Sequence, residues 1–465
     1  MVRDFPLCVN QTMQVSHAVF KAYDIRGIVG SEITPQMAYH LGRAYVTFLR
    51  EQYSGEHLSI VAGHDMRSSS LELQSELIRG FVEGGAQVFD IGLVSTPVFY
   101  FSVGHLKAHG GIIVTASHNP ATYNGFKCVR DLAIPVGGDS GFARIIELIE
   151  SEAYTQGEGS VEKISDITTV AVEAHKAFAG EGEIRSMKIV ADPGNGMGAQ
   201  YLDALFSFLP VEVVRMYWDL DGAFPNHESN PIKEETLKDL QVRVVMEKAD
   251  LGIATDGDGD RIFFVDETGK TVEPAIIRGI LSQIMLRRFP GSTICYDVRP
   301  GKITEDMIVE AGGKPSRTPV GHSLIKAQMR RKGAVFGGES SGHFYYNFPT
   351  GTYDGPVTSI MQILQEITRV GKPFSQIVAP LHRYVHSGEI NYHVEEKGAV
   401  LDRLKTQYAD GKQDMFDGLT VIYPTYWFNI RSSNTESLLR LNLEAVDLPT
   451  METKRDEVAA IIQQL

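Results

Sequence analysis

The sequence is poor in cysteine and in long apolar runs, and each shortage excludes a class of protein. Only three of its 465 residues are cysteines, Cys8, Cys128 and Cys295, and they are too scattered to share a metal ion or to build a disulfide framework. No run reaches the ~18 apolar residues of a membrane span, and the first residues lack the apolar stretch of a secretory signal. We therefore expect a reducing compartment and a cytoplasmic enzyme.

Positive charge is also in short supply. Lys and Arg number 44 against 58 Asp and Glu, so the formal net charge is −14. Such a chain is a poor match for nucleic acid or for an anionic membrane surface, and neither partner is expected. An anionic small molecule can still bind where basic side chains gather locally.

One pattern occurs three times along the chain. An apolar strand ends at an aspartate and enters a turn of small residues, and a later strand ends in a polar, glycine-containing loop. The paired positions are Asp65 and Ser117, Asp192 and Asp256, and Asp297 and Glu339. Strand, helix and strand in this order predict parallel pairing. We therefore predict three α/β domains of similar topology, each offering one loop to a shared site.

The last part of the chain differs, because its predicted strands follow one another directly. Adjacent strands of this kind favour an antiparallel α+β domain. The predicted domains are 1–160, 161–267, 268–380 and 381–465. The predicted linkers are 154–161, the region after Asp266, and 380–387.

The serine loop, residues 115–120 with the sequence Thr-Ala-Ser-His-Asn-Pro, follows the apolar strand 112–114. Pro120 has a fixed φ and disfavours helix at Asn119, so Ser117 lies in a stiff turn at a strand end. A hydroxyl held there is a natural nucleophile. An ordinary polar turn explains the same residues equally well, so the choice depends on the other loops.

The acidic loop, residues 256–261, places Asp256, Asp258 and Asp260 at alternate positions with glycines between them. Carboxylates at this spacing can surround one hard cation. A calcium-binding EF-hand has glycine at the sixth position, where this chain has Arg261, and its flanks are helices, whereas these read as strands. We predict a Mg²⁺ site. An acidic hairpin without metal is the simpler alternative.

The glycine loop, residues 337–343, contains Glu339, Ser341 and His343. A carboxylate, a hydroxyl and an imidazole together suit sugar hydroxyls, which donate and accept hydrogen bonds. His343 could also move protons near neutral pH. The segment 319–323, with His322, is a weaker candidate of the same kind, and a plain glycine-rich turn is the alternative.

Two further stretches suit phosphate. Arg431 opens a turn of short polar side chains with no acid before Glu436, which would make an oxyanion receptor unless it is a solvated hairpin. Near the N-terminus, Tyr23 and Arg26 lie in a stretch that mixes aromatic, basic and glycine residues. Arg26 offers a planar fork of donors to phosphate. A solvated strand and turn is the alternative there.

In this order the motifs resemble the α-D-phosphohexomutase family, in particular its phosphomannomutase/phosphoglucomutase branch. The matching positions run from Tyr23 to Thr435 and so cover nearly the whole chain. The resemblance implies three similar mixed α/β domains and a smaller α+β C-terminal domain around a central active-site cleft. It also implies interconversion of hexose 6-phosphate and hexose 1-phosphate through a phosphoserine and a hexose 1,6-bisphosphate, which also serves as activator.

The resemblance assigns roles residue by residue. It implies that Ser117 is phosphorylated and holds Mg²⁺ together with Asp256, Asp258 and Asp260, and that catalysis is assisted by Arg26, Lys127 and His343. It implies sugar contacts from Glu339 and Ser341, and a phosphate clamp made of Arg431, Ser433, Asn434 and Thr435. Lesser contacts are implied for Tyr23, Arg261, Lys302 and His322.

Substrate choice follows less directly. Asn434 resembles the mannose and glucose branch, since the amino-sugar mutases more often have glycine there, whereas Ser340 and Ser437 depart from residues common among relatives. We predict that the substrate is mannose phosphate, with glucose phosphate as the alternative. A metal-dependent sugar phosphatase, a non-catalytic sugar-phosphate-binding protein and a Ser–His hydrolase are rival classes. Either a monomer or a homodimer fits the sequence.

Overall fold

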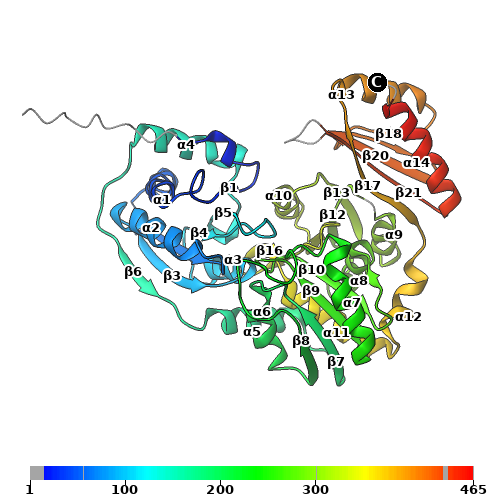
Figure 1. Ribbon diagram of the computed structural model, residues 1–465, viewed down its shortest axis with the longest axis horizontal. Coiled ribbons are helices and arrows are strands. Elements are labelled where there is room, and N and C mark those ends of the chain that lie inside the picture. Colours follow the sequence, from blue (N-terminus) through cyan, green and yellow to red (C-terminus); the bar gives the residue numbers. More distant parts are fainter. Residues whose placement is uncertain (1–14, 56, 300, 433–437, 464–465) are drawn as a thin grey trace, which may run out of the picture.

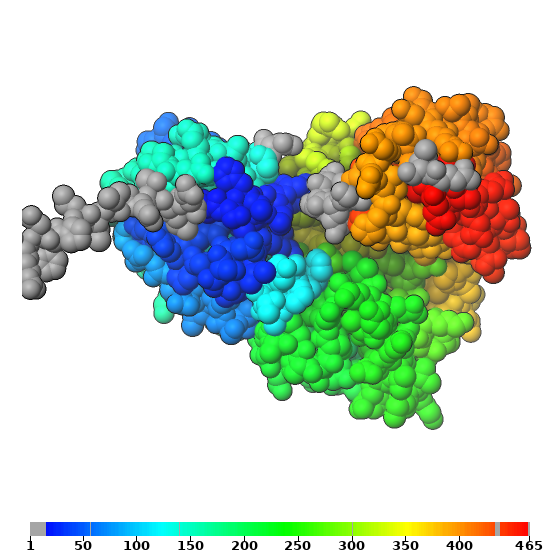
Figure 2. Space-filling model, turned by 45° about the horizontal axis from the view of Figure 1, so that its top comes forward, coloured from blue at the N-terminus to red at the C-terminus, as the bar shows by residue number. Residues whose placement is uncertain are grey.

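The computed structural model describes residues 15–55, 57–299, 301–432 and 438–463 (Figure 1). Four sheets follow one another along the chain, each covered by helices of its own. The N-terminal and C-terminal parts lie at opposite ends of the molecule, with the middle of the chain between them (Figure 2). No helix among the described residues is long and apolar enough to cross a bilayer.

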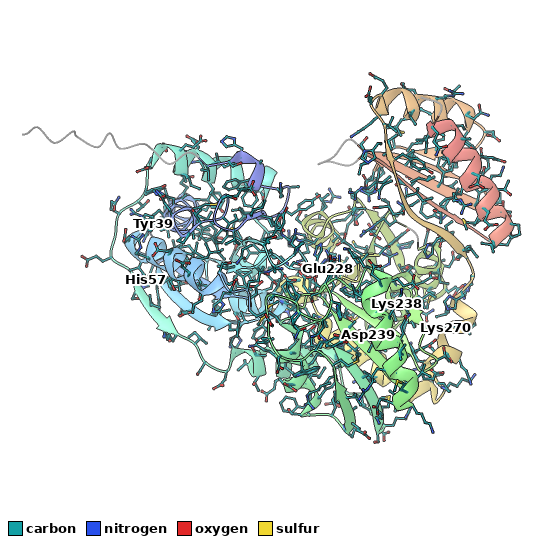
Figure 3. All side chains as sticks on the ribbon, in the orientation of Figure 1. Tyr39, His57, Glu228, Lys238, Asp239 and Lys270 are labelled. Atoms are coloured by element: carbon teal, nitrogen blue, oxygen red, sulfur yellow. The ribbon has the colours of Figure 1, made fainter. Side chains whose placement is uncertain are left out.

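The first sheet has six strands in the order β1-β5-β4-β2-β3-β6. Its strands are β1 (Ile25–Ile28), β2 (Ser59–His64), β3 (Gln87–Leu93), β4 (Gly110–Val114), β5 (Tyr123–Arg130) and β6 (Ser160–Lys163), and its helices are α1 (Pro35–Arg50), α2 (Ser70–Glu83), α3 (Thr96–His105) and α4 (Phe142–Ser151). Helix α1 begins after Thr34, whose Oγ1 caps the helix by accepting the N–H of Met37 at 3.1 Å. Tyr39 of α1, labelled in Figure 3, donates its hydroxyl hydrogen to Glu83 at the end of α2.

The second and third sheets have five strands each, in the orders β11-β10-β9-β7-β8 and β13-β12-β14-β15-β16. The second comprises β7 (Met187–Asp192), β8 (Val211–Arg215), β9 (Leu251–Thr255), β10 (Ile262–Asp266) and β11 (Thr271–Val272), with α5 (Ile167–Ala179), α6 (Gly198–Phe206) and α7 (Lys238–Glu247). The third comprises β12 (Thr293–Asp297), β13 (Lys314–Thr318), β14 (Phe336–Gly338), β15 (Phe344–Phe348) and β16 (Gly351–Asp354), with α8 (Pro274–Arg288), α9 (Lys302–Glu310), α10 (His322–Lys332), α11 (Pro356–Val370) and α12 (Phe374–Val378).

The repeated pattern of the sequence is confirmed by the strand pairing. β2 lies beside β4, β7 beside β9, and β12 beside β14, and each of these three pairs is parallel. The carboxyl ends of paired parallel strands meet at one edge of a sheet. Each predicted loop therefore begins next to the aspartate that ends the neighbouring strand.

The fourth sheet, β17-β21-β20-β19-β18, is antiparallel throughout, as predicted for the C-terminal α+β domain. Its strands are β17 (Val385–His393), β18 (Lys412–Asp414), β19 (Leu419–Ile422), β20 (Tyr426–Ser432) and β21 (Leu438–Ala445), and its helices are α13 (Lys397–Gln407) and α14 (Leu448–Gln463). A separate hydrophobic core lies between this sheet and its helices.

The first three domains share a hydrophobic core, which runs from Val61 in β2 to Val378 in α12. His175 of α5 marks the place where they meet. Its ring stacks on Phe348 at 4.7 Å between centroids and meets Phe101 of α3 edge-on at 5.7 Å. Side chains from three domains therefore pack around one buried imidazole.

Two of the predicted linkers are shorter than expected. Strand β6 begins at Ser160 and pairs with β3, so the chain is still part of the first sheet at Lys163. All four residues of β6 are exposed, and hence no apolar alternation marks this strand in the sequence. The last linker similarly gives way to β17 at Val385. The division of the chain at 160, 267 and 380 remains a prediction.

Candidate active site

Ser117 lies between β4 and β5 in a left-handed backbone conformation, with φ of +50°. Its N–H donates to Thr115 Oγ1 at 3.0 Å, and its side chain is almost fully buried. Ser117 Oγ lies 3.0 Å from Asp256 Oδ2 of the acidic loop. The first predicted loop therefore meets the second at the hydroxyl itself.

His118 lies close to the Ser117 hydroxyl. Side chains of neighbouring residues usually diverge, but His118 Nδ1 lies 3.2 Å from Ser117 Oγ. The left-handed backbone at Ser117 changes the usual direction of its side chain. Burial, followed by the charge of Arg261, lowers the pKa of His118 well below its ordinary value, so a neutral ring is favoured.

The acidic loop gathers three carboxylates. Asp256, Asp258 and Asp260 have ligand oxygens within 4.8 Å of one another, and all three side chains are buried. Burial, together with the charges of Asp260 and Asp258, raises the pKa of Asp256 to about 8. The flanking segments are the antiparallel strands β9 and β10, which excludes the helices of an EF-hand.

These residues fit a hard divalent cation. Among the described residues, the Oδ1 atoms of Asp258 and Asp260 are buried and accept no hydrogen bond. Buried carboxylate oxygens without a donor are costly unless a cation neutralises them. Oxygen ligands alone, supplied by carboxylates beside a hydroxyl, are the set that Mg²⁺ prefers.

Lys127 and Arg26, both predicted to assist catalysis, lie beside this cluster. Lys127 Nζ is 2.6 Å from Asp258 Oδ2 and 2.6 Å from Asp260 Oδ2. Burial opposes the charged form of Lys127, but the two carboxylates outweigh it and raise the pKa well above its ordinary value. Arg26 donates to Ala116 O at 3.0 Å, next to the serine.

His343 is held by partners at both ring nitrogens. Arg261 Nε lies 3.1 Å from His343 Nε2 and can only donate, so Nε2 accepts and the proton is on Nδ1. Nδ1 in turn lies 2.8 Å from Asp354 Oδ1 at the end of β16. Lys326 contacts the other oxygen of Asp354 at 2.8 Å. Burial opposes protonation of His343, but Asp260 and Asp354 outweigh it and raise its pKa.

Glu339 and Ser341 of the glycine loop both lie close to Arg299, which no sequence motif marks. Arg299 Nη2 lies 3.4 Å from Glu339 Oε1 and 3.4 Å from Ser341 Oγ. Its Nε donates to Asp297 at 2.5 Å, so the guanidinium is fixed at the end of β12. Its position two residues after the strand-ending aspartate is the signal that could have identified it.

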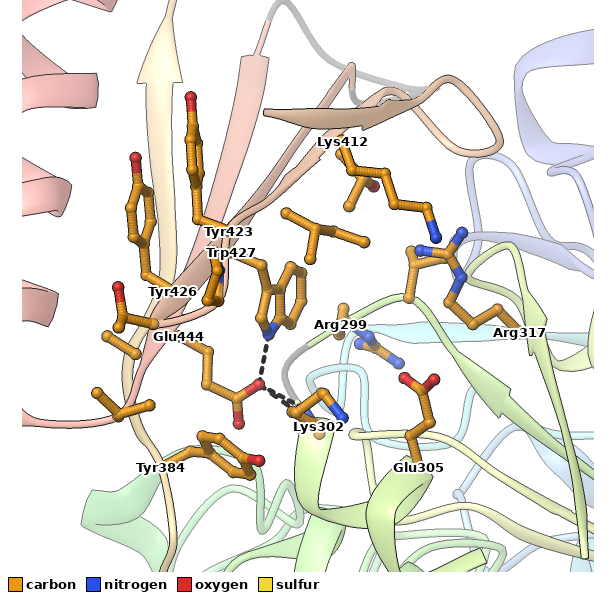
Figure 4. A pocket seen from close by; sticks show the side chains of 18 of the residues that line it. Arg299, Lys302, Glu305, Arg317, Tyr384, Lys412, Tyr423, Tyr426, Trp427 and Glu444 are labelled. Carbon is orange, nitrogen blue, oxygen red and sulfur yellow. Dashed lines mark hydrogen bonds between the residues drawn. The ribbon is translucent and has the colours of Figure 1, made fainter. Parts of the chain in front are cut away.

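Lys302 begins α9, and its Nζ pairs with Asp306 one turn later in the same helix. Its N–H donates to Glu444 Oε2 at 3.1 Å, and Trp427 Nε1 donates to the same oxygen at 2.7 Å (Figure 4). These residues line a cavity of about 280 Å³ between the third and fourth sheets. Arg299, three residues earlier in the chain, lines the same cavity and also contacts Glu339 of the glycine loop.

Tyr23 and His322 meet across the first and third domains. Their rings pack edge to face, with centroids 5.4 Å apart. Burial, followed by the charge of Lys326, lowers the pKa of His322 well below its usual value. Both residues thus lie at a domain boundary close to the glycine loop.

Arg431 on β20 is paired, although the sequence shows no acid near it. Its Nη2 donates to Glu389 Oε2 at 2.6 Å, and Glu389 belongs to β17. Arg440 Nη1 lies 3.4 Å from the other oxygen of Glu389. The remaining residues of the predicted clamp, Ser433, Asn434 and Thr435, lie outside the described residues.

Comparison with known proteins identifies the class of this fold and site. Four family models of phosphoglucomutase/phosphomannomutase match in order: the α/β/α domains I, II and III at residues 17–156, 166–269 and 274–384, and the C-terminal domain at 389–461. A crystal structure of a phosphoglucomutase/phosphomannomutase family protein from Burkholderia thailandensis superposes with a TM-score of 0.88 at 32% identity, covering 97% of this chain and 98% of that one.

Curated relatives agree over almost the whole length. A protein named phosphohexose mutases from Xanthomonas campestris pv. campestris is 37% identical over 450 residues, covering 96% of this chain and 99% of its own length. A phosphomannomutase/phosphoglucomutase from Pseudomonas aeruginosa is 35% identical over 432 residues, covering 92% of each. The chain belongs to the phosphoglucomutase/phosphomannomutase family, which makes it an enzyme of the mutase class.

Proposed function

We propose that this chain interconverts hexose 6-phosphate and hexose 1-phosphate, with mannose phosphate as the preferred substrate. Phosphorylated Ser117 would give its phosphoryl group to the free hydroxyl of the bound sugar, and a hexose 1,6-bisphosphate would be the intermediate and activator. The observation that carries the proposal is the 3.0 Å contact between Ser117 Oγ and Asp256 inside a cluster of three buried carboxylates. A hydrolytic serine would also need an acid that orients its base, and among the described residues no acid is hydrogen-bonded to His118, the imidazole next to Ser117 Oγ.

The cluster suits Mg²⁺ as the bound cation. Ser117, Asp256, Asp258 and Asp260 would hold it. When bound, Mg²⁺ neutralises charge on the transferring phosphoryl group. Arg26, bonded to Ala116 O, and Lys127, bonded to Asp258, supply fixed positive charge close to the serine and the acidic loop, which favours an anionic phosphoserine.

The other residues bind and orient the sugar. We propose that Glu339, Ser341 and Arg299 contact the sugar, with Arg261, His322 and Tyr23 at the edge of the same site. In this structure the lone pair of His343 Nε2 accepts the N–H of Arg261 Nε, and the proton is on Nδ1. We propose that Nε2 takes a proton from the attacking hydroxyl when Arg261 turns from His343 to the bound substrate. Arg431, with the residues after it, would hold the phosphate that does not react. Cytoplasmic location and a monomeric or dimeric state remain predictions from the sequence.

The test combines intact-protein mass spectrometry with a competition assay between mannose 1-phosphate and glucose 1-phosphate. Wild-type protein treated with glucose 1,6-bisphosphate should carry one phosphate, and Ser117→Ala should carry none and lack mutase activity. Preference for mannose phosphate should appear as a higher kcat/KM in the competition. Full mutase activity in Ser117→Ala would rule the scheme out, and release of inorganic phosphate without activator would favour a phosphatase.

A further inference from the structure

Arg67 is buried against the serine loop without touching its reactive hydroxyl. It follows β2, and its side chain is only 3% exposed. Nη2 donates to the carbonyl oxygens of Ser117 at 2.9 Å and Asn119 at 2.6 Å. Nη1 donates to those of Pro120 and Tyr123, both at 2.9 Å. A single guanidinium thus binds four backbone carbonyls of one turn.

These hydrogen bonds act where the backbone is strained. A non-glycine residue with φ near +50° is disfavoured by roughly 1–2 kcal/mol, so Ser117 needs support from its surroundings. Its carbonyl oxygen is fixed by Arg67 on one side and by the acidic loop on the other. A Cβ atom at Gly257 would lie 2.4 Å from that oxygen, so glycine alone allows the two loops to approach this closely. The direction of Ser117 Oγ toward Asp256 therefore depends on where this carbonyl is held.

The second domain covers the other face of Arg67. The ring of Phe224 lies 5.1 Å from the guanidinium carbon, within the range of a cation–π contact. Gly222 approaches the backbone of Arg67 so closely that a Cβ atom there would lie 2.5 Å from Arg67 Cα. Arg67 is thus held between the serine loop of the first domain and a loop of the second.

The third domain repeats this arrangement. Asp65 and Arg67 follow β2 and are two residues apart, and the same spacing separates Asp297, the last residue of β12, from Arg299. In each case the aspartate contacts the arginine, at 3.3 Å for Arg67 and 2.5 Å for Arg299. Each arginine then reaches the loop that follows the neighbouring parallel strand. The first and third domains thus each use an aspartate–arginine pair to hold a loop of the site.

We propose that Arg67 is a positioning residue for Ser117: it holds the serine loop in the conformation that accepts and donates the phosphoryl group, and the loop of Phe224 holds Arg67 in place. The inference rests on the proposed role of Ser117. It requires that phosphoryl transfer depend on Arg67 while sugar binding, which uses mainly the glycine loop and Arg299 of the third domain, does not.

The test compares Arg67→Ala with Arg43→Ala. Arg43 is a matched control, because it is also buried in the first domain, at 5% exposure, but donates to Glu83 and to Thr155 O. Arg67→Ala should lower kcat about 100-fold, the loss that a displacement of reacting groups by about 1 Å can cause, with KM changed less than about twofold. Arg43→Ala should keep kcat within about twofold of wild type, since its contacts leave the reacting groups in place.

Two readouts separate positioning from general damage. Guanidinium ions at low millimolar concentration should restore part of the activity of Arg67→Ala and none of any loss in Arg43→Ala. Phe224→Leu, which leaves the hydrogen bonds of Arg67 in place, should lower kcat severalfold with KM unchanged. Intact mass should show slower phosphorylation of Ser117 by glucose 1,6-bisphosphate in Arg67→Ala.

The outcomes distinguish the two proposals. Wild-type rates of phosphorylation and turnover in Arg67→Ala would overturn this inference and leave the proposed function standing. A misfolded Arg67→Ala together with unchanged kinetics in Phe224→Leu would also overturn it. Absence of phosphate on Ser117 in the active wild-type enzyme would instead defeat the proposed function itself.

Discussion

At Ser117 the backbone conformation and the proposed role of the side chain favour different residues. The left-handed conformation favours glycine, but the proposed chemistry needs a hydroxyl at that position. Arg67 and the close approach of Gly257 hold the conformation from outside the residue. Strain of this kind persists where the surrounding structure determines the backbone, which is common at functional sites.

This strain can be measured with two inactive variants. Ser117→Gly and Ser117→Ala both lack the hydroxyl, and we expect neither to carry phosphate. Glycine relieves the strain that alanine retains, so Ser117→Gly should be more stable than Ser117→Ala by about 1 kcal/mol. Urea unfolding followed by circular dichroism gives the difference. Equal stabilities would mean that the left-handed conformation carries no strain.

His343 depends on a second residue for its tautomer. Asp354→Asn would place an amide where the carboxylate now accepts the Nδ1 proton. We expect kcat to fall by about 10- to 100-fold, with a smaller effect on KM, because a group that orients a catalytic ligand or base usually contributes that much. Steady-state kinetics of Asp354→Asn, His343→Asn and the double variant test this expectation. If the two residues act together, the double variant should be no worse than His343→Asn.

At the scale of elements, helices α1 and α2 pack closely against each other at two glycines, Gly42 and Gly80. A Cβ atom at Gly80 would lie 2.4 Å from Tyr39 O, and one at Gly42 would lie 2.5 Å from Leu77 O. The helices are therefore in contact through their backbones. Any larger residue would have to separate them.

Gly80→Ala should accordingly destabilise the first domain by about 1–3 kcal/mol, the usual effect of overpacking. Gly398→Ala is a matched control in helix α13, because a Cβ atom there meets nothing within 4 Å. Its effect should be neutral or slightly stabilising, since alanine favours helix. The thermal midpoint measured by circular dichroism distinguishes the two. A stable Gly80→Ala would show that the helices can move apart freely.

Much of the element order was predictable, because apolar periodicity and turn residues mark most strands and helices of the α/β domains. The convergence of the loops also followed from the parallel pairing of strands. Strand β6 was missed since its residues are exposed and show no alternation. Arg67 and Glu389 were missed for a different reason. Each contacts its partner only after folding brings together segments about 40 or more residues apart, and no local motif records such a contact.

Lys302 and Arg299 show why the start of a helix matters for a predicted contact. The resemblance implies a lesser contact from Lys302, but it does not record that α9 begins at this residue and that its side chain pairs with Asp306. Arg299 precedes that helix and reaches Glu339. Both residues line the cavity between the third and fourth sheets.

At the scale of the whole molecule, His175 joins three domains as a neutral residue. Burial lowers its pKa to about 3, whereas in the unfolded chain it titrates near 6.5. Between these values the unfolded state binds a proton that the folded state does not. Its contribution to stability is therefore complete above pH 6.5 and is lost as the pH falls toward 3.

We expect His175→Phe to make the protein less sensitive to acid. The stability of the wild type should fall, relative to the variant, by about 1.4 kcal/mol per pH unit below 6.5, or about 2 kcal/mol at pH 5. Urea unfolding of both proteins at pH 7, 6 and 5 gives this difference. If the free energies of unfolding of the two proteins change equally with pH, His175 is protonated in the folded state or exposed to water.

The core of the C-terminal domain has consequences for recombination. Among the described residues it has no member in common with the core that runs through the first three domains. In a chimera the first three domains would therefore have to be exchanged together, whereas the C-terminal domain, from residue 385 onward, could be exchanged alone. A graft from a relative would exchange Arg431 and its surroundings without repacking the rest. It would have to keep Glu444, whose carboxylate accepts from the first N–H groups of α9, and also Asp414 and Asp417, which accept from Arg317 and from the N–H of Val320 in the third domain.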